Sequence, residues 1–187
     1  MKHYHIENPF ILTIFGASGD LAKLKIFPAL YNLIEQKRLP KEFYIIGFAR
    51  TAKSQEEFRQ EFKKSITEKA PHPIKASLLE ELVKKVYYFE GKYDDIESFK
   101  AYHKYVKKVT DGQRMTHIAY FSVPPQTFKP IIENLGETKV PKDDLRIVIE
   151  KPFGQDLASA TDLFHFIARY FDEEHTYLLD HYLGKSA

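Results

Sequence analysis

Apolar residues in the first part of the chain change from continuous runs to helical spacing and back. Residues 10–15 and 43–49 are short apolar runs of the kind that form buried strands. Between them, from about residue 20 to residue 34, apolar side chains recur every three or four positions. This spacing predicts a helix that Pro28 should kink. The chain therefore opens with a predicted β-α-β unit.

The same alternation continues along the rest of the chain. Apolar runs predict strands at residues 86–89, 117–123, 145–149 and 175–179. Helices are predicted after a capping box at Ser54, over residues 74–85 and 96–109, and after Asp156, where Leu157, Ala160, Phe164, Ile167 and Phe171 should face inward. Alternating strands and helices predict an α/β fold, a doubly wound (Rossmann-like) sheet of about six mostly parallel strands with helices on both faces.

Length and composition are those of one soluble domain. The 187 residues are 43% apolar and 29% charged, with a net charge of +2 and no cysteine. Such a small charge gives no support for a nucleic-acid or membrane partner, and no apolar run reaches the ~18 residues of a membrane span. The N-terminus lacks the apolar core of a signal peptide. Because cysteine is absent, disulfides and thiolate chemistry are excluded, which fits the cytoplasm. No metal site is predicted.

The first predicted strand ends in a glycine turn that leads directly into a helix. Gly16, Ala17, Ser18 and Gly19 form this turn, and the helical pattern begins near Asp20. Glycines let the backbone approach a pyrophosphate closely, while the N–H groups and the dipole of the helix start favour its negative charge. The G-x-x-G-x-x-A spacing fits the general dinucleotide fingerprint only loosely. A purely steric turn is the alternative.

Polar residues also follow the second and fifth predicted strands. Arg50 and Thr51 stand where an acidic residue would accept from the ribose of NAD, whereas an arginine can pair with the 2′-phosphate of NADP. A solvated arginine at a strand end is the alternative. Glu150 and Lys151 precede Pro152 at the edge of the sheet that binds ligands, and the Lys151–Pro152 bond is our candidate for a cis peptide.

Two further segments carry candidate contacts. Tyr120 lies in the fourth strand, and Val123 and Pro124 lie at its carboxyl end, where open α/β sheets bind ligands. A core aromatic is the alternative for Tyr120. Residues 180–185 place Asp, His, Tyr and Lys side chains together. They can grip a phosphorylated sugar, with Asp180 supporting a base, or they can form a polar terminus.

These segments together resemble the glucose-6-phosphate dehydrogenase family. GASGDLAKLKIFPALYNL resembles the family's nucleotide-binding opening, Glu-Lys-Pro-Phe-Gly its strand-end motif and Asp-His-Tyr-Leu-Gly-Lys its substrate segment. The motifs occur in the family's order and at similar spacing. The resemblance implies an oxidoreductase of the oxidative pentose phosphate pathway. Such an enzyme oxidises D-glucose 6-phosphate at C1 to 6-phospho-D-glucono-1,5-lactone and passes the hydride to NADP+.

The resemblance also implies a role for each matching position. The pyrophosphate would be cradled by Gly16, Ala17, Ser18, Gly19, Asp20, Leu21 and Ala22. Arg50, with Thr51 beside it, would contact the 2′-phosphate, and Tyr120, Val123 and Pro124 would lie toward the nicotinamide. Lys151 would meet both substrate and cofactor. His181, Tyr182 and Lys185 would hold the substrate phosphate, and Asp180 would join the catalytic hydrogen-bond network.

The sequence departs from the family after its last motif. Lys185 is followed by Ser186 and Ala187, where the family has Lys-Glu and a larger α+β domain. We therefore expect residues 1–187 to form a single NADP-binding domain, with 180–185 starting the substrate segment. The family's C-terminal domain, with its general-base histidine and the dimer interface of its homo-oligomers, would be absent. A positioned base is worth roughly 10² to 10⁴ in rate, so the chain should bind cofactor and barely turn over.

Two other classes of protein compete with this interpretation. The glucose–fructose oxidoreductase and inositol dehydrogenase-like family shares a Glu-Lys-Pro lysine. It normally carries G-x-G-x-x-G, however, and lacks the His-Tyr-Leu-Gly-Lys segment, so both motifs favour the first family. A non-catalytic NADP-binding module stays open, because fold alone does not separate a module from part of an enzyme.

Overall fold

The strands of the chain form one parallel sheet. A computed structural model describes residues 5–70, 73–138 and 144–179. Within these residues the strand order is β3-β2-β1-β4-β5-β6, and every neighbouring pair is parallel. The strands are β1 (Phe10–Phe15), β2 (Phe43–Ala49), β3 (Val86–Glu90), β4 (Thr116–Phe121), β5 (Leu145–Glu150) and β6 (Thr176–Leu179). The predicted doubly wound α/β fold is confirmed.

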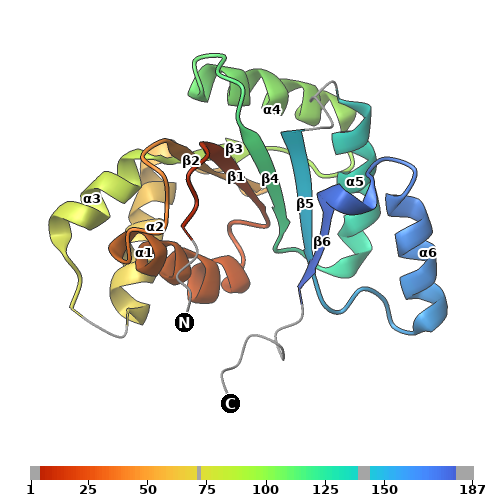
Figure 1. The fold of residues 1–187 in the computed structure, drawn as a ribbon, viewed down its shortest axis with the longest axis horizontal. Helices are drawn as coiled ribbons and strands as arrows, with labels where there is room; N and C mark the ends of the chain where they lie inside the picture. Colours follow the sequence, from red (N-terminus) through yellow and green to blue (C-terminus); the bar gives the residue numbers. More distant parts are fainter. Residues whose placement is uncertain (1–4, 71–72, 139–143, 180–187) are drawn as a thin grey trace.

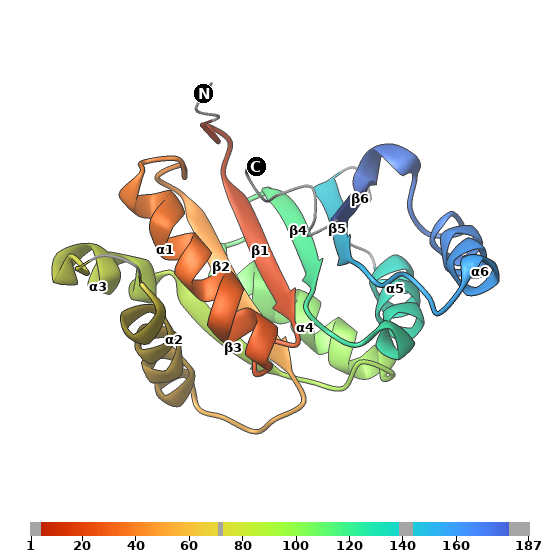
Figure 2. The ribbon, with the colours of Figure 1, turned by 90° about the horizontal axis from the view of Figure 1, so that it is seen from below.

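Helices cover both faces of this sheet (Figures 1 and 2). Each face has its own apolar core. One layer contains α1 (Phe27–Glu35), α2 (Gln55–Lys69) and α3 (Ala76–Lys84). The other contains α4 (Ile96–Val109), α5 (Phe128–Glu137) and α6 (Leu157–Ile167). Short turns of helix are η1 (Ala22–Ile26), η2 (Pro125–Thr127) and η4 (Glu173–His175). The helices between successive strands thus return the chain to the amino edge, which leaves the carboxyl edge for loops.

The helix that follows the glycine turn is irregular next to Pro28, where a kink was predicted. Helical structure begins at residue 20, and η1 is a π-helical turn in which the Phe27 N–H donates to the Ala22 carbonyl. Regular α-helix starts only at Phe27. Pro28 has no N–H and cannot donate the hydrogen bond to the preceding turn that an α-helix requires. The change from π-helix to α-helix therefore occurs next to a position where this hydrogen bond is impossible.

Capping residues mark the predicted helix starts, but the inward face of α6 differs from the prediction. Ser54 forms the predicted capping box, and Asp156, predicted to cap its helix, also does so through a capping box. In α6, however, Leu157 is 83% exposed and Phe164 is 37% exposed. The residues that pack inward are Leu163, Ile167 and Phe171, with Ala160 half-buried. The helix packs on α5 at the end of the sheet, so only a narrow stripe of it is covered.

Helix α5 and several element ends were not predicted. No element was assigned to the residues of α5, because Pro130 obscures its pattern. Pro130 lies in the first turn of the helix, where a missing N–H costs little. Strand β4 ends at Phe121 rather than at residue 123, and β6 and α3 begin one and two residues later than predicted. These differences lie at element ends, where sequence patterns are weakest.

The core contains a polar group that joins three elements. The Thr13 hydroxyl of β1 lies 2.7 Å from Nε2 of His117 in β4, and the Tyr102 hydroxyl of α4 lies 3.1 Å from the same nitrogen. The Thr13 and Tyr102 hydroxyls also bond to each other. All of these side chains are buried. Burial, with a smaller contribution from His103, lowers the pKa of His117 from 6.5 to about 4, so its imidazole is neutral at pH 7.

Candidate functional site

Apart from Tyr120, which lies in β4, the predicted site residues within the described part of the chain follow the carboxyl ends of four strands. The glycine turn follows β1, Arg50 follows β2, Val123 follows β4 and Lys151 follows β5. Strand β1 leads to β2 on one side, whereas its other neighbour β4 leads to β5 on the opposite side. The strand order therefore reverses between β1 and β4. Open α/β sheets bind ligands in the crevice at this point.

The glycine turn has a fixed backbone. Gly16 has a φ of +86°, and a Cβ there would lie 2.1 Å from the Ser122 carbonyl oxygen. The Gly16 N–H donates to the Phe48 carbonyl at 2.9 Å, and the Gly19 N–H donates to the Gly16 carbonyl at 2.9 Å. Helix begins at the next residue. The amino end of a helix dipole thus faces the edge of the sheet, which suits a phosphate.

Arg50 is exposed and rests on an aromatic ring. Its guanidinium carbon lies 5.5 Å from the ring centroid of Tyr93, which is itself buried. Burial raises the pKa of the Tyr93 phenol, and Arg50 and the Gly16 backbone partly offset this. No sequence motif predicted a role for Tyr93. Its position shortly after β3, the strand beside β2, is the signal that could have found it.

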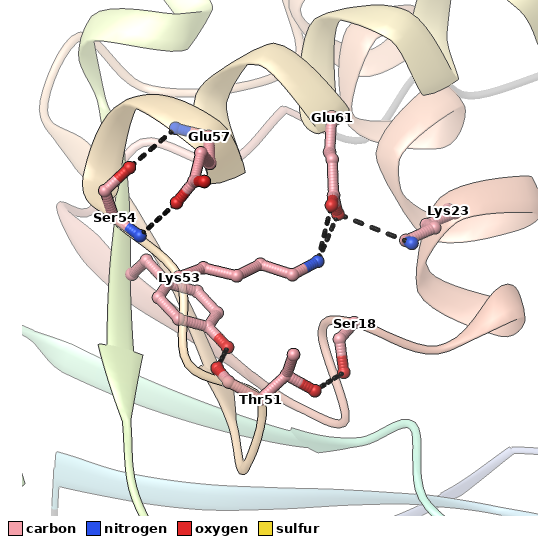
Figure 3. A network of polar contacts seen from close by, with 8 residues as sticks. Ser18, Lys23, Thr51, Lys53, Ser54, Glu57 and Glu61 are labelled. Carbon is pink, nitrogen blue, oxygen red and sulfur yellow. Dashed lines mark hydrogen bonds and ion pairs between the residues drawn. The ribbon is translucent and has the colours of Figure 1, made fainter.

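The segment after β2 contacts the glycine turn directly (Figure 3). The Thr51 hydroxyl donates to the Ser18 hydroxyl at 3.5 Å, and the Tyr88 hydroxyl donates to the Thr51 carbonyl. Burial, followed by the nearby Glu90, raises the pKa of Tyr88 to about 12, so it remains a neutral donor. Two segments that the sequence singled out separately therefore meet at one place.

Beside this contact is an ion-pair group that the sequence analysis missed. Lys53 Nζ lies 2.5 and 2.6 Å from the two carboxylate oxygens of Glu61, and Lys23 Nζ lies 3.4 Å from the same carboxylate (Figure 3). Burial alone would raise the pKa of Glu61, but Lys53 and Lys23 hold it below its ordinary value. We call these residues the Glu61 group.

On the β4–β5 side of the point where the strand order reverses, Tyr120 meets Glu150. The Tyr120 hydroxyl donates to the Glu150 carboxylate, which is buried at the end of β5. Burial and then Glu150 raise the pKa of Tyr120. The Tyr120 ring packs against the core on the α1 face, as the core alternative for this residue requires, while its hydroxyl lies among polar partners. Val123 adjoins Gly16, because a Cβ on Gly16 would lie 2.7 Å from the Val123 side chain.

Lys151 lies beside the end of β6. Its bond to Pro152 is cis, as predicted. The Lys151 N–H donates to the Leu179 carbonyl at 3.1 Å, so the residue that precedes the predicted substrate segment is adjacent to the predicted substrate lysine. Asp180, His181, Tyr182 and Lys185, the members of that segment with predicted roles, lie outside the described residues.

Cavities occur next to the site as well as far from it. A cavity of about 500 Å³ lies beside Pro152 and Phe153, and Gln126 and Lys129 also line it. One of similar size, about 510 Å³, lies between α4 and α5 and includes none of the predicted site residues. Among the described residues, no group of three or more His, Asp or Glu side chains could hold a metal ion. No described helix is long and apolar enough to cross a membrane.

Comparison with known proteins decides the family. Residues 13–187 match the sequence model of the glucose-6-phosphate dehydrogenase NAD-binding domain. The chain belongs to the glucose-6-phosphate dehydrogenase family. Its part of that family is a nicotinamide-dinucleotide-binding domain, and the family is one of oxidoreductases. The glucose–fructose oxidoreductase-like alternative is thereby disfavoured.

Relatives of the family agree over nearly the whole chain. The glucose-6-phosphate 1-dehydrogenase of Schizosaccharomyces pombe is 41% identical over 93% of this chain and 35% of its own length. That of Chlamydia pneumoniae is 39% identical over 95% of this chain and 36% of its own. A solved glucose-6-phosphate dehydrogenase in complex with glucose 6-phosphate has a TM-score of 0.87 and 35% identity, covering 100% of this chain and 39% of that one. The chain thus spans about a third of the length of the relatives it matches.

Proposed function

We propose that residues 1–187 form the NADP-binding domain of a glucose-6-phosphate dehydrogenase. In a longer polypeptide this domain would serve the oxidation of glucose 6-phosphate at C1. What carries the proposal is the contact between the glycine turn and the segment after β2, where Ser18 and Thr51 meet and Arg50 stands exposed. A pyrophosphate and a ribose 2′-phosphate need these two groups side by side. The substrate-bound relative supports glucose 6-phosphate as the sugar.

Each part of the crevice has a task in this proposal. The turn from Gly16 through Ala22 would hold the pyrophosphate by backbone N–H groups, and Arg50 and Thr51 would hold the 2′-phosphate. Tyr120, Val123 and Pro124 would border the nicotinamide. When bound, NADP+ supplies the hydride acceptor. Lys151 follows β5 and its N–H donates to the carbonyl of Leu179, which supports a task in orienting the sugar phosphate toward the cofactor.

The remaining expectations belong to the same proposal. Asp180 would support the catalytic hydrogen bonds, and His181, Tyr182 and Lys185 would hold the substrate phosphate. No motif of this chain supplies the general-base histidine that the family resemblance implies. The 187 residues alone should therefore bind cofactor with little turnover, as a non-catalytic module also would. Homo-oligomer formation and a cytoplasmic location stay predictions.

A calorimetric titration of the chain with NADP+ and with NAD+ tests the cofactor. We expect NADP+ to bind more tightly than NAD+. Arg50→Ala should weaken NADP+ binding by about 10- to 100-fold, which is the change in affinity expected from the loss of hydrogen bonds to a charged group. Binding of NAD+ should change little. Arg169→Ala is the matched control, because Arg169 also rests on an aromatic ring, at 5.5 Å from Phe166, but at the end of α6. Equal affinities for the two cofactors, or equal effects of the two arginine variants, would contradict the proposal.

A further inference from the structure

The segment that connects β2 to α2 carries Arg50 and has no regular structure of its own. The segment begins at Arg50, directly after β2, and ends at Ser54, which caps α2. Between these points it is tied to its surroundings at Thr51 and at Lys53. The position of the Arg50 backbone therefore depends on these ties as well as on β2.

The tie at Lys53 is unusually well buried. The Lys53 side chain is 13% exposed, the lowest value of any cation among the ion pairs of the described residues. Exposed pairs such as Lys64–Glu68 contribute little, because water screens them and their long side chains lose freedom. Lys53 Nζ instead lies within 2.6 Å of both carboxylate oxygens of Glu61. A displacement of Lys53 would separate its largely buried ammonium group from this carboxylate, which is unfavourable.

Glu61 connects three separate elements through this pair. It lies on α2, Lys53 lies on the segment after β2, and Lys23 lies on η1, the turn of helix that begins just after the glycine turn. One carboxylate therefore holds the segment that carries Arg50 against the helix that would receive the pyrophosphate (Figure 3). Two lysines and one carboxylate also leave a net charge of +1 beside the site.

The two cofactors respond differently to a displacement of this segment. NAD+ and NADP+ share every group except the 2′-phosphate, which the proposed function assigns to Arg50 and Thr51. The glycine turn is fixed independently by its hydrogen bonds to Phe48 and within itself. A small shift of the segment would therefore remove contacts to the 2′-phosphate and leave the pyrophosphate cradle intact.

We propose that the Glu61 group, Lys23, Glu61 and Lys53, is a positioning element that sets the preference for NADP+ over NAD+. It acts by fixing Arg50 and Thr51 in place, without contact between Lys53 and the phosphate. This inference rests on the proposed function, since it requires that the 2′-phosphate binds at Arg50. It assigns a role in cofactor selectivity to three residues outside the glycine turn and outside the Arg50–Thr51 pair.

Titrations of NADP+ and NAD+ into Lys53→Met and Glu61→Gln separate positioning from simple charge. We expect each variant to weaken NADP+ binding about fivefold, the low end of typical coupling between sites, and to change NAD+ binding less than twofold. Glu61→Gln adds positive charge to the site, so a role in charge alone would strengthen NADP+ binding. A stronger complex, an unchanged ratio of the two affinities, or an equal loss for both cofactors would each overturn the proposal.

Two controls complete this experiment. Glu80→Gln makes the same change in charge at an exposed pair, since Glu80 lies 2.6 Å from Lys63 on the outer helices, and it should leave both affinities unchanged. Lys53→Arg keeps the ion pair and should retain the preference; if Lys53→Met does not fold, Glu61→Gln alone decides the test. A wild-type chain without preference for NADP+ would refute the proposed function and this inference together. A wild-type preference that survives in both variants would refute the inference alone.

Discussion

Gly16 meets two demands that no other residue type meets together. Its φ of +86° belongs to the left-handed region, and the Ser122 carbonyl occupies the space of a Cβ. Gly112 has a similar φ of +73°, but nothing lies within 4 Å of its Cβ position. The two glycines therefore separate the cost of the backbone conformation from the cost of the steric overlap.

We expect Gly16→Ala to destabilise the fold more than Gly112→Ala does. The left-handed conformation alone costs roughly 1–2 kcal/mol in a residue with a Cβ. Gly16→Ala should exceed this by about 2 kcal/mol, as overpacking in a tight site does, and should weaken binding of both cofactors. Urea unfolding of the two variants, followed by titration, measures the difference. Equal losses of stability would show that the loop around Ser122 yields to the new side chain.

Among single residues, the sequence identifies those site residues that directly follow a predicted strand. The glycine turn and Arg50 could be found because each directly follows an apolar run. Tyr93 also follows a strand, but its contact with Arg50 becomes visible only once β3 lies beside β2. Glu61 has no such local signal, because its role arises only when α2 packs against the segment after β2. A lysine such as Lys53 reads as a solvated charge in sequence, and its low exposure becomes visible only in the folded chain.

Among the elements, α6 shows how an apolar pattern overstates burial. Of the predicted inward face, Ile167 and Phe171 are buried, but Leu157 and Phe164 are exposed, and Leu163, which was not predicted, is buried. Leu157 is the first residue after the Asp156 cap and is exposed. Apolar residues near the start of a terminal helix therefore carry less information about the core than those in its middle.

Truncation of two leucines on α6 should therefore change stability by very different amounts. Leu163→Ala should destabilise the domain by about 2–5 kcal/mol, because it leaves a cavity against the sheet. Leu157→Ala removes the same atoms from a side chain that is 83% exposed, and should change stability by less than about 0.5 kcal/mol. Chemical unfolding at fixed pH gives both values. A loss at Leu157 comparable with that at Leu163 would mean that another surface covers α6.

Helix starts were predicted better than helix faces. The capping boxes at Ser54 and Asp156 are formed by residues three positions apart, so the sequence alone contains both partners. Helix α5 lacked such a signal, because no side chain caps its start and Pro130 interrupts the pattern. Local hydrogen bonds can be predicted from sequence, whereas packing against a distant partner cannot.

For the whole molecule, the polar group at His117 couples folding to pH. Its imidazole is held neutral between the Thr13 and Tyr102 hydroxyls, far from solvent. The folded pKa of about 4 lies below the ordinary 6.5, so the unfolded chain binds more protons between these values. Stability is therefore fully present above pH 6.5 and declines as the pH falls toward 4.

We expect His117 alone to remove roughly 2 kcal/mol of stability between pH 7 and pH 5. Urea unfolding at several pH values measures this slope. In His117→Gln, which keeps a polar side chain without a titrating ring, the slope should become shallower by that amount. His165→Gln, on the exposed side of α6, should retain the wild-type slope. A slope that persists in His117→Gln would assign the acid sensitivity to other groups.

The overall arrangement of the sheet followed from the sequence more fully than its site did. Alternating strands and helices allow few topologies once crossovers must be right-handed and parallel, which is why the fold class was predicted. The meeting of Ser18 with Thr51, and of Lys151 with the end of β6, depends on strand order and register. No local pattern states which strands are neighbours.

The central position of β1 determines the order in which a growing chain can fold. Phe10 pairs with Phe43 on one side and with Thr116 on the other, and Thr116 is made long after Phe43. At about 5–20 residues per second, β1 waits on the order of 10 seconds for its second neighbour on the ribosome. Strands β1, β2 and β3 can pack with helices α1, α2 and α3 before β4 has been synthesised. Until β4 is made, one edge of the first strand stays open, and this nascent half-sheet is the stage at which association with other chains competes with folding.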